Sequence, residues 1–445
     1  MNNGNGDNLS EKAKGSANRD TATTITRPVA TIGEFFADGS MIELIGGESD
    51  GNLRLLLWDG ANETIGPLIE YGGVKYEPAQ FQRSLLREWT LPTQCRSHGT
   101  TRELLAEICK LIEDFAGLPA RSASLVGRFV LCSWLVEAVQ VVPALVLVGP
   151  DMARGNRLVA LMHCLCRHGL RMTGLTPAGL RSLPSGAGIT MLISQPTIGD
   201  KLERMLQEAS RRDQKIPYRG GLLDLFGVQV IHAESIPFRE PLSLRTIQIP
   251  MIPGGEQLPA FDPDIQRRVT ADFQAKLLSF RRAKLSAACK LQFDSSKFFF
   301  AMRELATSIA AATPDDAELQ AEVFDLLRDE DEEIRAGKWV ESSAVAVESV
   351  LVACRESPGG VIYVGELATI AEEIMRRRGE NITMDPGVFG KRLKLLGFKT
   401  EPRDAKGMKV RLTEDVCRRA LQLAHDLGIP WVDSGAPPEP TEKGA

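Results

Sequence analysis

The chain has 445 residues, of which 43% are hydrophobic and 25% charged, a composition typical of globular proteins that excludes wholesale disorder. Its formal net charge of -5 excludes a uniformly basic nucleic-acid coat protein, so any nucleic-acid surface has to be local. The eight cysteines form no Cys-x-x-Cys pair, which argues against a zinc ribbon and a disulfide framework. We therefore expect free thiols, a cytoplasmic location and, at roughly 150 residues per domain, about three domains.

Polar segments stand at both ends of the chain. Residues 1–29 lack an apolar leader and are predicted to form a disordered tail, and residues 431–445 a flexible tail. Residues 30–95 carry short apolar runs separated by Gly-Gly and Asp-Gly dipeptides, which predict a small antiparallel β-rich module. These runs lie at residues 41–45, 53–58 and 67–71.

Residues 96–252 alternate between helical and strand patterns. An amphipathic helix is expected at residues 100–116, and helices at 156–168 and 201–211 separate apolar strands. Fully apolar strands that alternate with helices predict a parallel α/β sheet covered on both faces. The third strand carries His232, which we expect to be buried and hydrogen-bonded. The expected strands lie at residues 144–148, 189–194, 228–233 and 245–250.

One apolar stretch, at residues 129–148, has the length of a membrane span. It contains Glu137 and Pro143, and a charge and a proline in mid-span are costly in a bilayer. We therefore predict a buried helix at residues 122–139, a buried strand at 144–148 and no membrane partner.

The segment at residues 144–158, ALVLVGPDMARGNRL, leads an apolar strand through a Gly-Pro turn into a helix, which is the setting of a phosphate-binding P-loop. The full motif, G-x-x-x-x-G-K-[ST], turns backbone N–H groups towards phosphates, reaches them with a lysine and holds Mg²⁺ with a hydroxyl. Gly149 fits the first position. Arg154, Gly155 and Asn156 replace the second glycine, the lysine and the hydroxyl.

The acidic pair that would position Mg²⁺ and water is missing as well, because the following apolar strand ends in Ser194 and Gln195. Without the lysine and the carboxylates, most of the electrostatic stabilisation of phosphoryl transfer is lost, so we predict no catalytic residues and expect no cofactor. Weak ATP binding without hydrolysis stays open, as does an ordinary α/β domain with a Gly-Pro turn. The degenerate nucleotide-binding residues of this prediction are Gly149, Pro150, Arg154, Gly155 and Asn156.

On these features, residues 100–250 resemble the ATPase core of AAA+-like replication helicases carried by phages, plasmids and genomic islands. The resemblance rests on the strand that ends at Val148-Gly149-Pro150, the later strand at 189–195, and the LSLR sequence at 242–245 before another apolar strand. It implies a P-loop-like core, self-association through that core, and an arginine acting across a subunit interface. Arg245 matches that arginine in position.

Residues 253–340 are predicted to form a helical, lid-like region, and residues 341–430 show the order helix, strand, helix, helix, hairpin, helix, which is that of a winged helix. Residues 386–412 hold eight basic and only two acidic residues. A helix with an apolar back and a cationic front suits the major groove of DNA, and a basic hairpin suits its phosphates. The predicted DNA-binding residues are Lys391, Arg392, Lys394, Lys399, Arg403, Lys406, Lys409 and Arg411.

The sequence therefore predicts a DNA-binding, replication-associated or regulatory protein of a mobile-element type with a catalytically degenerate P-loop NTPase core. Two alternatives remain: a protein-interaction scaffold that uses the winged helix for protein contacts, and an NTPase with non-standard phosphate ligands. The run at residues 163–168 contains His and Cys but no second ligand pair, so we predict core cysteines there and no metal site.

Overall fold

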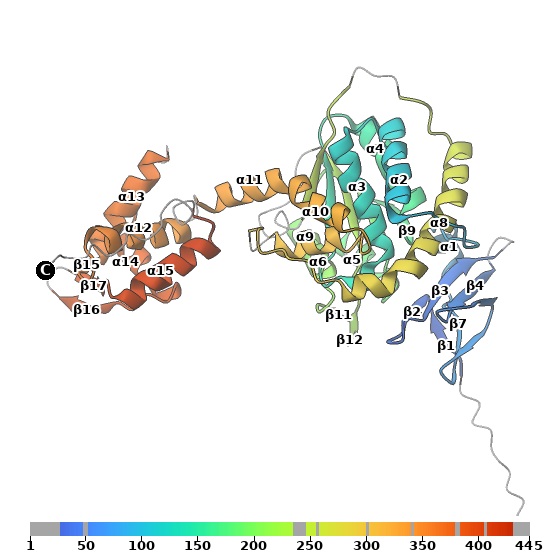
Figure 1. Ribbon diagram of the computed structural model, residues 1–445, viewed down its shortest axis with the longest axis horizontal. Helices are drawn as coiled ribbons and strands as arrows, with labels where there is room; N and C mark the ends of the chain where they lie inside the picture. Colours follow the sequence, from blue (N-terminus) through green and yellow to red (C-terminus); the bar gives the residue numbers. More distant parts are fainter. Residues whose placement is uncertain are drawn as a thin grey trace, which may run out of the picture.

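The computed structural model consists of a larger body around the central sheets and a smaller body formed by the C-terminal helices and hairpin (Figure 1). Of the two predicted tails, only residues 27–29 are described. Arg245 and the hairpin residue Lys406 also lie outside the described residues. The structure describes residues 27–47, 52–234, 246–254, 258–299, 302–339, 342–378, 383–404 and 407–429.

The N-terminal module contains two small sheets. One is antiparallel throughout, in the order β2-β3-β4-β5, as the sequence predicts. The other has the order β1-β7-β6, and its β1–β7 pair is parallel, so the expectation of a wholly antiparallel module is wrong for this pair. The elements are β1 (Val29–Thr31), β2 (Gly33–Phe35), β3 (Met41–Gly46), β4 (Leu53–Trp58), β5 (Glu63–Gly66), β6 (Ile69–Tyr71), β7 (Val74–Pro78) and α1 (Arg83–Glu88).

A five-stranded parallel sheet in the order β14-β8-β13-β10-β9 forms the centre of the larger body. The predicted parallel α/β sheet is therefore confirmed. The sequence did not predict β9, an edge strand that contains Arg171 and has only its first two residues buried. The strands are β8 (Ala144–Val148), β9 (Gly169–Thr173), β10 (Thr190–Ser194), β13 (Gln229–Ala233) and β14 (Thr246–Pro250); β11 (Ile216–Tyr218) and β12 (Gly221–Leu223) form a separate hairpin.

Helices cover this sheet, and α2, α3 and α4 contact one another or the long helix α8 (Pro263–Lys290) (Figure 1). A capping box of Thr100 and Glu103 fixes the start of α2. The predicted helix followed by a buried strand at residues 122–148 is confirmed, since α3 ends before β8 begins. No helix in the described ranges combines the length and the apolar character of a membrane span. The helices are α2 (Thr101–Ala116), α3 (Ala120–Trp134), η1 (Val136–Ala138), α4 (Met152–Leu165), α5 (Pro177–Arg181) and α6 (Asp200–Ala209).

The region after β14 is helical, as predicted. Asp262 caps the first and longest of its helices, α8, with its carboxylate accepting from two backbone N–H groups. Phe273, Leu277 and Phe280 of α8 are buried in the same hydrophobic core as the inner residues of α2, α3 and β8. The sheet and this helical region therefore share one core. The helices are α8 (Pro263–Lys290), α9 (Arg303–Ala310), α10 (Ala317–Leu326) and α11 (Arg328–Trp339).

The smaller body has its own hydrophobic core, in which Leu367, Phe389 and Val410 are buried. Its elements follow the order helix, strand, helix, helix, hairpin, helix, and its strands form one antiparallel sheet in the order β15-β17-β16. The elements are α12 (Ser342–Glu356), β15 (Val361–Tyr363), α13 (Val364–Arg377), α14 (Pro386–Leu395), β16 (Glu401–Asp404), β17 (Gly407–Arg411) and α15 (Glu414–Asp426).

Candidate functional site

The loop after β8 is three residues long, because β8 ends at Val148 and α4 begins at Met152. Gly149 has a φ of 143°, and a Cβ there would collide with the backbone of Met251 at the end of β14, so only glycine fits. The Met251 N–H donates to the Val148 carbonyl at 2.7 Å, and the Asp151 N–H donates to the Met251 carbonyl at 3.1 Å. The turn is thus tied closely to the neighbouring strand.

Asp151 closes the N-terminus of α4. Its carboxylate accepts from the Arg154 backbone N–H at 3.0 Å and lies 3.6 Å from Nε of the same arginine. The N–H groups and the positive dipole end at a helix N-terminus favour an anion, and here a carboxylate of the chain takes that position. A phosphate at this place would meet a negative charge.

The other predicted nucleotide-binding residues are helical and do not line a loop. The Arg154 side chain is only 13% exposed and packs against Gly254 and Gly117. Asn156 is exposed on α4. The structure therefore brings Gly149 and Pro150 together in the turn and places Arg154, Gly155 and Asn156 in the first two turns of α4.

Gly155 faces the end of β13. A Cβ added to Gly155 would lie closer than 3.0 Å to three atoms of the His232 ring, two of them at 2.7 Å. His232 is fully buried, as expected, and burial lowers its pKa. The expected hydrogen bond is wrong, since neither ring nitrogen has a hydrogen-bond partner among the described residues.

The end of β10 carries no carboxylate. The Gln195 N–H donates to the His232 carbonyl at 3.1 Å, and the Gln195 side chain donates to the Thr197 carbonyl at 3.0 Å. At the carboxyl ends of the sheet strands, where α/β proteins usually bind ligands, the described residues therefore offer no lysine, hydroxyl and carboxylate set for Mg²⁺-ATP.

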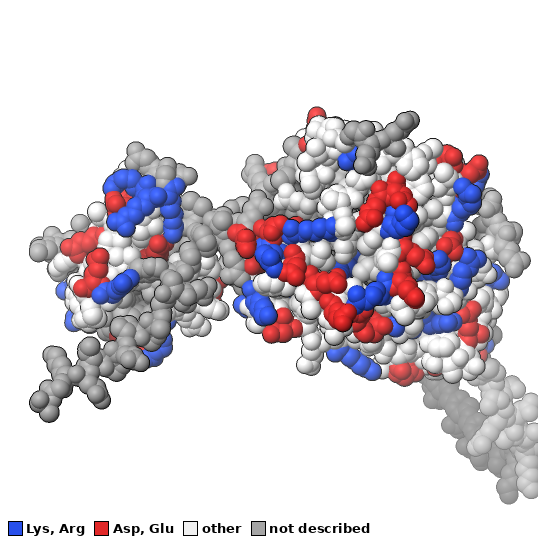
Figure 2. All heavy atoms as spheres, turned by 45° about the horizontal axis from the view of Figure 1, so that its top comes forward, with Lys and Arg blue, Asp and Glu red and all other residues white. Residues whose placement is uncertain are grey.

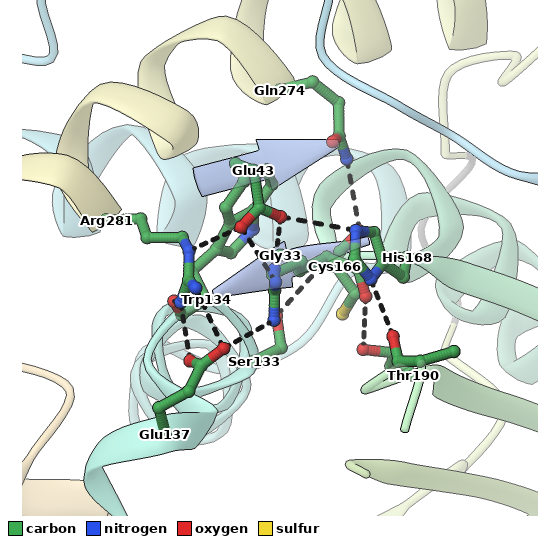
Figure 3. Close-up of polar contacts among 12 residues, drawn as sticks. Gly33, Glu43, Ser133, Trp134, Glu137, Cys166, His168, Thr190, Gln274 and Arg281 are labelled. Carbon is green, nitrogen blue, oxygen red and sulfur yellow. Dashed lines mark hydrogen bonds and ion pairs between the residues drawn. The ribbon is translucent and has the colours of Figure 1, made fainter. Parts of the chain in front are cut away.

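A buried charge network, which the sequence reasoning missed, lies where β3, η1, α8 and the loop before β9 meet (Figure 3). Glu43 of β3 accepts from Nε and Nη2 of Arg167 at 2.7 and 2.8 Å and from Nε of Arg281 in α8 at 2.9 Å. Glu137 accepts from Arg281 at 2.6 and 2.8 Å and from Arg167 at 3.2 Å. His168 lies beside Glu43, with Nε2 and Oε1 3.3 Å apart.

This network connects three distant segments of the chain. Burial raises the pKa of Glu43, but the guanidinium groups of Arg167 and Arg281 outweigh it and hold that pKa well below its usual range. The same balance lowers the pKa of Glu137 to about 2. The two carboxylates therefore stay ionised, and their contacts with Arg167 and Arg281 join the β module to α8 and the sheet. A carboxylate inside the apolar run of β3 was the sequence signal of this site.

The predicted DNA-binding residues on α14 are open to solvent. Asp385 caps this helix, and the buried Phe389 and Leu393 hold its back against the C-terminal core. Lys391 and Lys394 are exposed and have no ion-pair partner within the described ranges. The same holds for Lys399, just beyond the helix, and Arg392 is half-buried.

The basic residues of the hairpin are placed differently. Arg411 donates to Glu401 at 2.9 Å, and Nζ of Lys409 lies 3.8 Å from the same carboxylate. Arg411 lowers the pKa of Glu401. Arg403 lies in β16, and Lys406 is outside the described residues. Figure 2 likewise shows acidic side chains beside basic ones on both bodies. One acid thus partly neutralises two of the predicted hairpin cations.

The run at residues 163–168 does not converge on a metal geometry. His163 is within 2.8 Å of the Glu88 carbonyl, and Cys164 and Cys166 are buried. The prediction of core cysteines is confirmed. Within the described ranges, no group of three or more His, Cys, Asp or Glu side chains is arranged to hold a metal ion.

No protein-family model matches the chain, and no curated protein matches its sequence. Among solved structures, the apo A form of the NrS-1 C-terminal region is 12% identical, with a TM-score of 0.37 over 83% of this chain and 96% of that chain. A full-length MCM homolog from Methanopyrus kandleri is 11% identical, with a TM-score of 0.31 over 66% and 78%. Drosophila ORC bound to DNA is 14% identical, with a TM-score of 0.20 over 78% and 96%. These similarities are too distant to indicate a function, so the function is argued from the residues of the chain itself.

Proposed function

We propose that this chain is a DNA-binding protein that contacts duplex DNA through its C-terminal body, a winged helix. The observation that carries the proposal is the set of exposed cations on α14, Lys391 and Lys394, which point away from its buried residues and have no acidic partner among the described residues. A short helix with an apolar back and a free cationic front suits the major groove and its flanking phosphates.

The α/β core supports this role without ATP hydrolysis. Three features favour a non-hydrolysing core: the three-residue turn after β8, the Asp151 carboxylate at the N-terminus of α4, and the uncharged end of β10. Together with the resemblance noted in the sequence, they support a replication-associated or regulatory subunit of a mobile-element type. Self-association through the core stays a prediction, because Arg245 lies outside the described residues.

Salt-dependent DNA affinity tests the proposal. Fluorescence anisotropy of a labelled duplex is measured across a salt series for the wild type and for Lys391→Ala, Arg392→Ala, Lys394→Ala combined. Each lost phosphate contact should reduce the slope of log affinity against log salt by about one, so the triple variant should bind more weakly and less steeply.

The matched control removes three cations that already have acidic partners in the same body. Arg376 and Arg377 pair with Glu373, and Arg418 pairs with Asp415. Changing these three to alanine alters net charge equally and should leave the salt slope nearly unchanged. No binding of the wild type at low salt would sink the DNA proposal and favour a protein partner for α14. Mg²⁺-dependent phosphate release from ATP would contradict the non-hydrolysing core.

A further inference from the structure

The outer face of α14 combines cations with two unusually exposed apolar side chains. Val388 is 59% exposed and Leu395 is 87% exposed. Residues spaced by three or four positions share one face of a helix, and the face opposite the buried Leu393 follows this spacing. It is formed by Val388, Lys391, Arg392 and Leu395.

A single exposed leucine needs no explanation, but this arrangement is more specific. Both apolar residues lie on the same face, and no acidic residue occurs from Pro386 to Lys399. The fitting partner is therefore a polyanion that also presents small apolar groups. The major groove of duplex DNA meets this description, because each thymine places its C5-methyl group there, between two rows of phosphates.

The residue types on α14 also restrict what the helix can recognise. It has no Asn or Gln for paired hydrogen bonds to adenine and no Asp or Glu to accept from cytosine. Lys391 and Arg392 can donate to guanine or to phosphate, and Val388 and Leu395 can contact thymine methyls.

We infer that Val388 and Leu395 contact thymine methyl groups in the major groove and give the helix a preference for thymine-containing sites. This inference rests on the proposed function and names the groups on the DNA that the same surface reads. It makes the two apolar residues specificity-determining, whereas the neighbouring cations supply affinity.

The test compares two duplexes of identical mixed sequence, one with thymine and one with deoxyuridine at every thymine position. The substitution removes only the methyl group and leaves base pairing and phosphates unchanged. Affinity is measured by anisotropy with the full chain. The wild type should bind the deoxyuridine duplex about fourfold more weakly for each methyl group that it buries.

The variant Val388→Ala, Leu395→Ala should bind both duplexes equally, with the affinity of the wild type for the deoxyuridine form. The control Leu421→Ala removes another exposed leucine, 51% exposed on α15, and should keep the wild-type difference between the duplexes. Equal binding of both duplexes by the wild type overturns this inference but leaves DNA binding intact. Failure to bind either duplex overturns the proposed function and, with it, the inference.

Discussion

The close contact between Gly155 and His232 predicts that Gly155→Ala destabilises the wild type but stabilises a variant that lacks the His232 ring. Gly155 lies in the second turn of α4, where alanine would ordinarily stabilise a helix by about 0.5–1 kcal/mol relative to glycine. A Cβ at this position overlaps the fully buried His232 ring, with two ring carbons at 2.7 Å. The ring must move within a closely packed core, so Gly155→Ala should destabilise the wild type.

The size of the effect follows from these two opposing contributions. Overpacking a core costs about 1–3 kcal/mol, which exceeds the helix-propensity gain, so a net loss of about 1–2 kcal/mol is expected in the wild type. In a His232→Ala background the obstructing ring is gone, and the same substitution should stabilise by about 0.5–1 kcal/mol. The coupling between the two positions is then about 1.5–3 kcal/mol, within the range seen for contacting residues.

Urea unfolding followed by tryptophan fluorescence measures this cycle, because Trp134 lies in the same core as α4. The control is Gly179→Ala in α5, in the same body as Trp134, where an added Cβ approaches no heavy atom closer than 3.5 Å and the change should be neutral or stabilising. If Gly155→Ala changes the free energy of unfolding equally, within about 0.5 kcal/mol, in the wild type and in the His232→Ala variant, the two sites are independent. That result would refute the packing argument.

Three further predictions concern charges. Glu43→Gln should lower the free energy of unfolding by about 3–5 kcal/mol, because it leaves buried guanidinium charge uncompensated. The control Glu63→Gln, which breaks the partly exposed pair with Arg282, should cost at most about 1 kcal/mol. Equal urea midpoints for the two variants would contradict this prediction. Burial raises the pKa of Glu137, but Arg281 and Arg167 outweigh it and lower that pKa from 4.5 to about 2. The ionised carboxylate therefore stabilises the fold at every pH above its unfolded pKa. Its contribution disappears as pH falls from about 4.5 towards 2, and Glu137→Gln should flatten the decline of thermal midpoint with pH. Glu401→Gln should release Arg411 and steepen the salt slope of DNA binding by up to about one, and an unchanged slope would show that Arg411 does not reach a phosphate.

The parallel sheet could be predicted because its strands are buried on both faces and appear in the sequence as unbroken apolar runs. The edge strand β9 could not, since only its first two residues are buried and its polar remainder breaks the run. The start of α4 could have been found, because Asp151 is a favourable N-cap residue before a helical pattern. Comparison with a P-loop template placed these residues in a loop.

The buried charge network was harder to predict. Glu43 signalled a buried partner, but its partners lie more than a hundred residues away, at Arg167 and Arg281. Nothing in the sequence pairs those positions, because the pairing depends on how the β module docks on α8 and the sheet. The cations of α14 were predictable from helical spacing, whereas the pairing of Arg411 and Lys409 with Glu401 depends on cross-strand register.

The position of one glycine explains why the turn after β8 resembles a phosphate site in sequence and differs from it in structure. A P-loop uses its second glycine to expose backbone N–H groups to phosphates. Here the corresponding position is Arg154, held close to Asp151, and the glycine stands one residue later, against His232. That glycine keeps α4 close to β13. The acid that caps the helix also places negative charge where a phosphate would bind, so the same residues that close the turn disfavour a nucleotide.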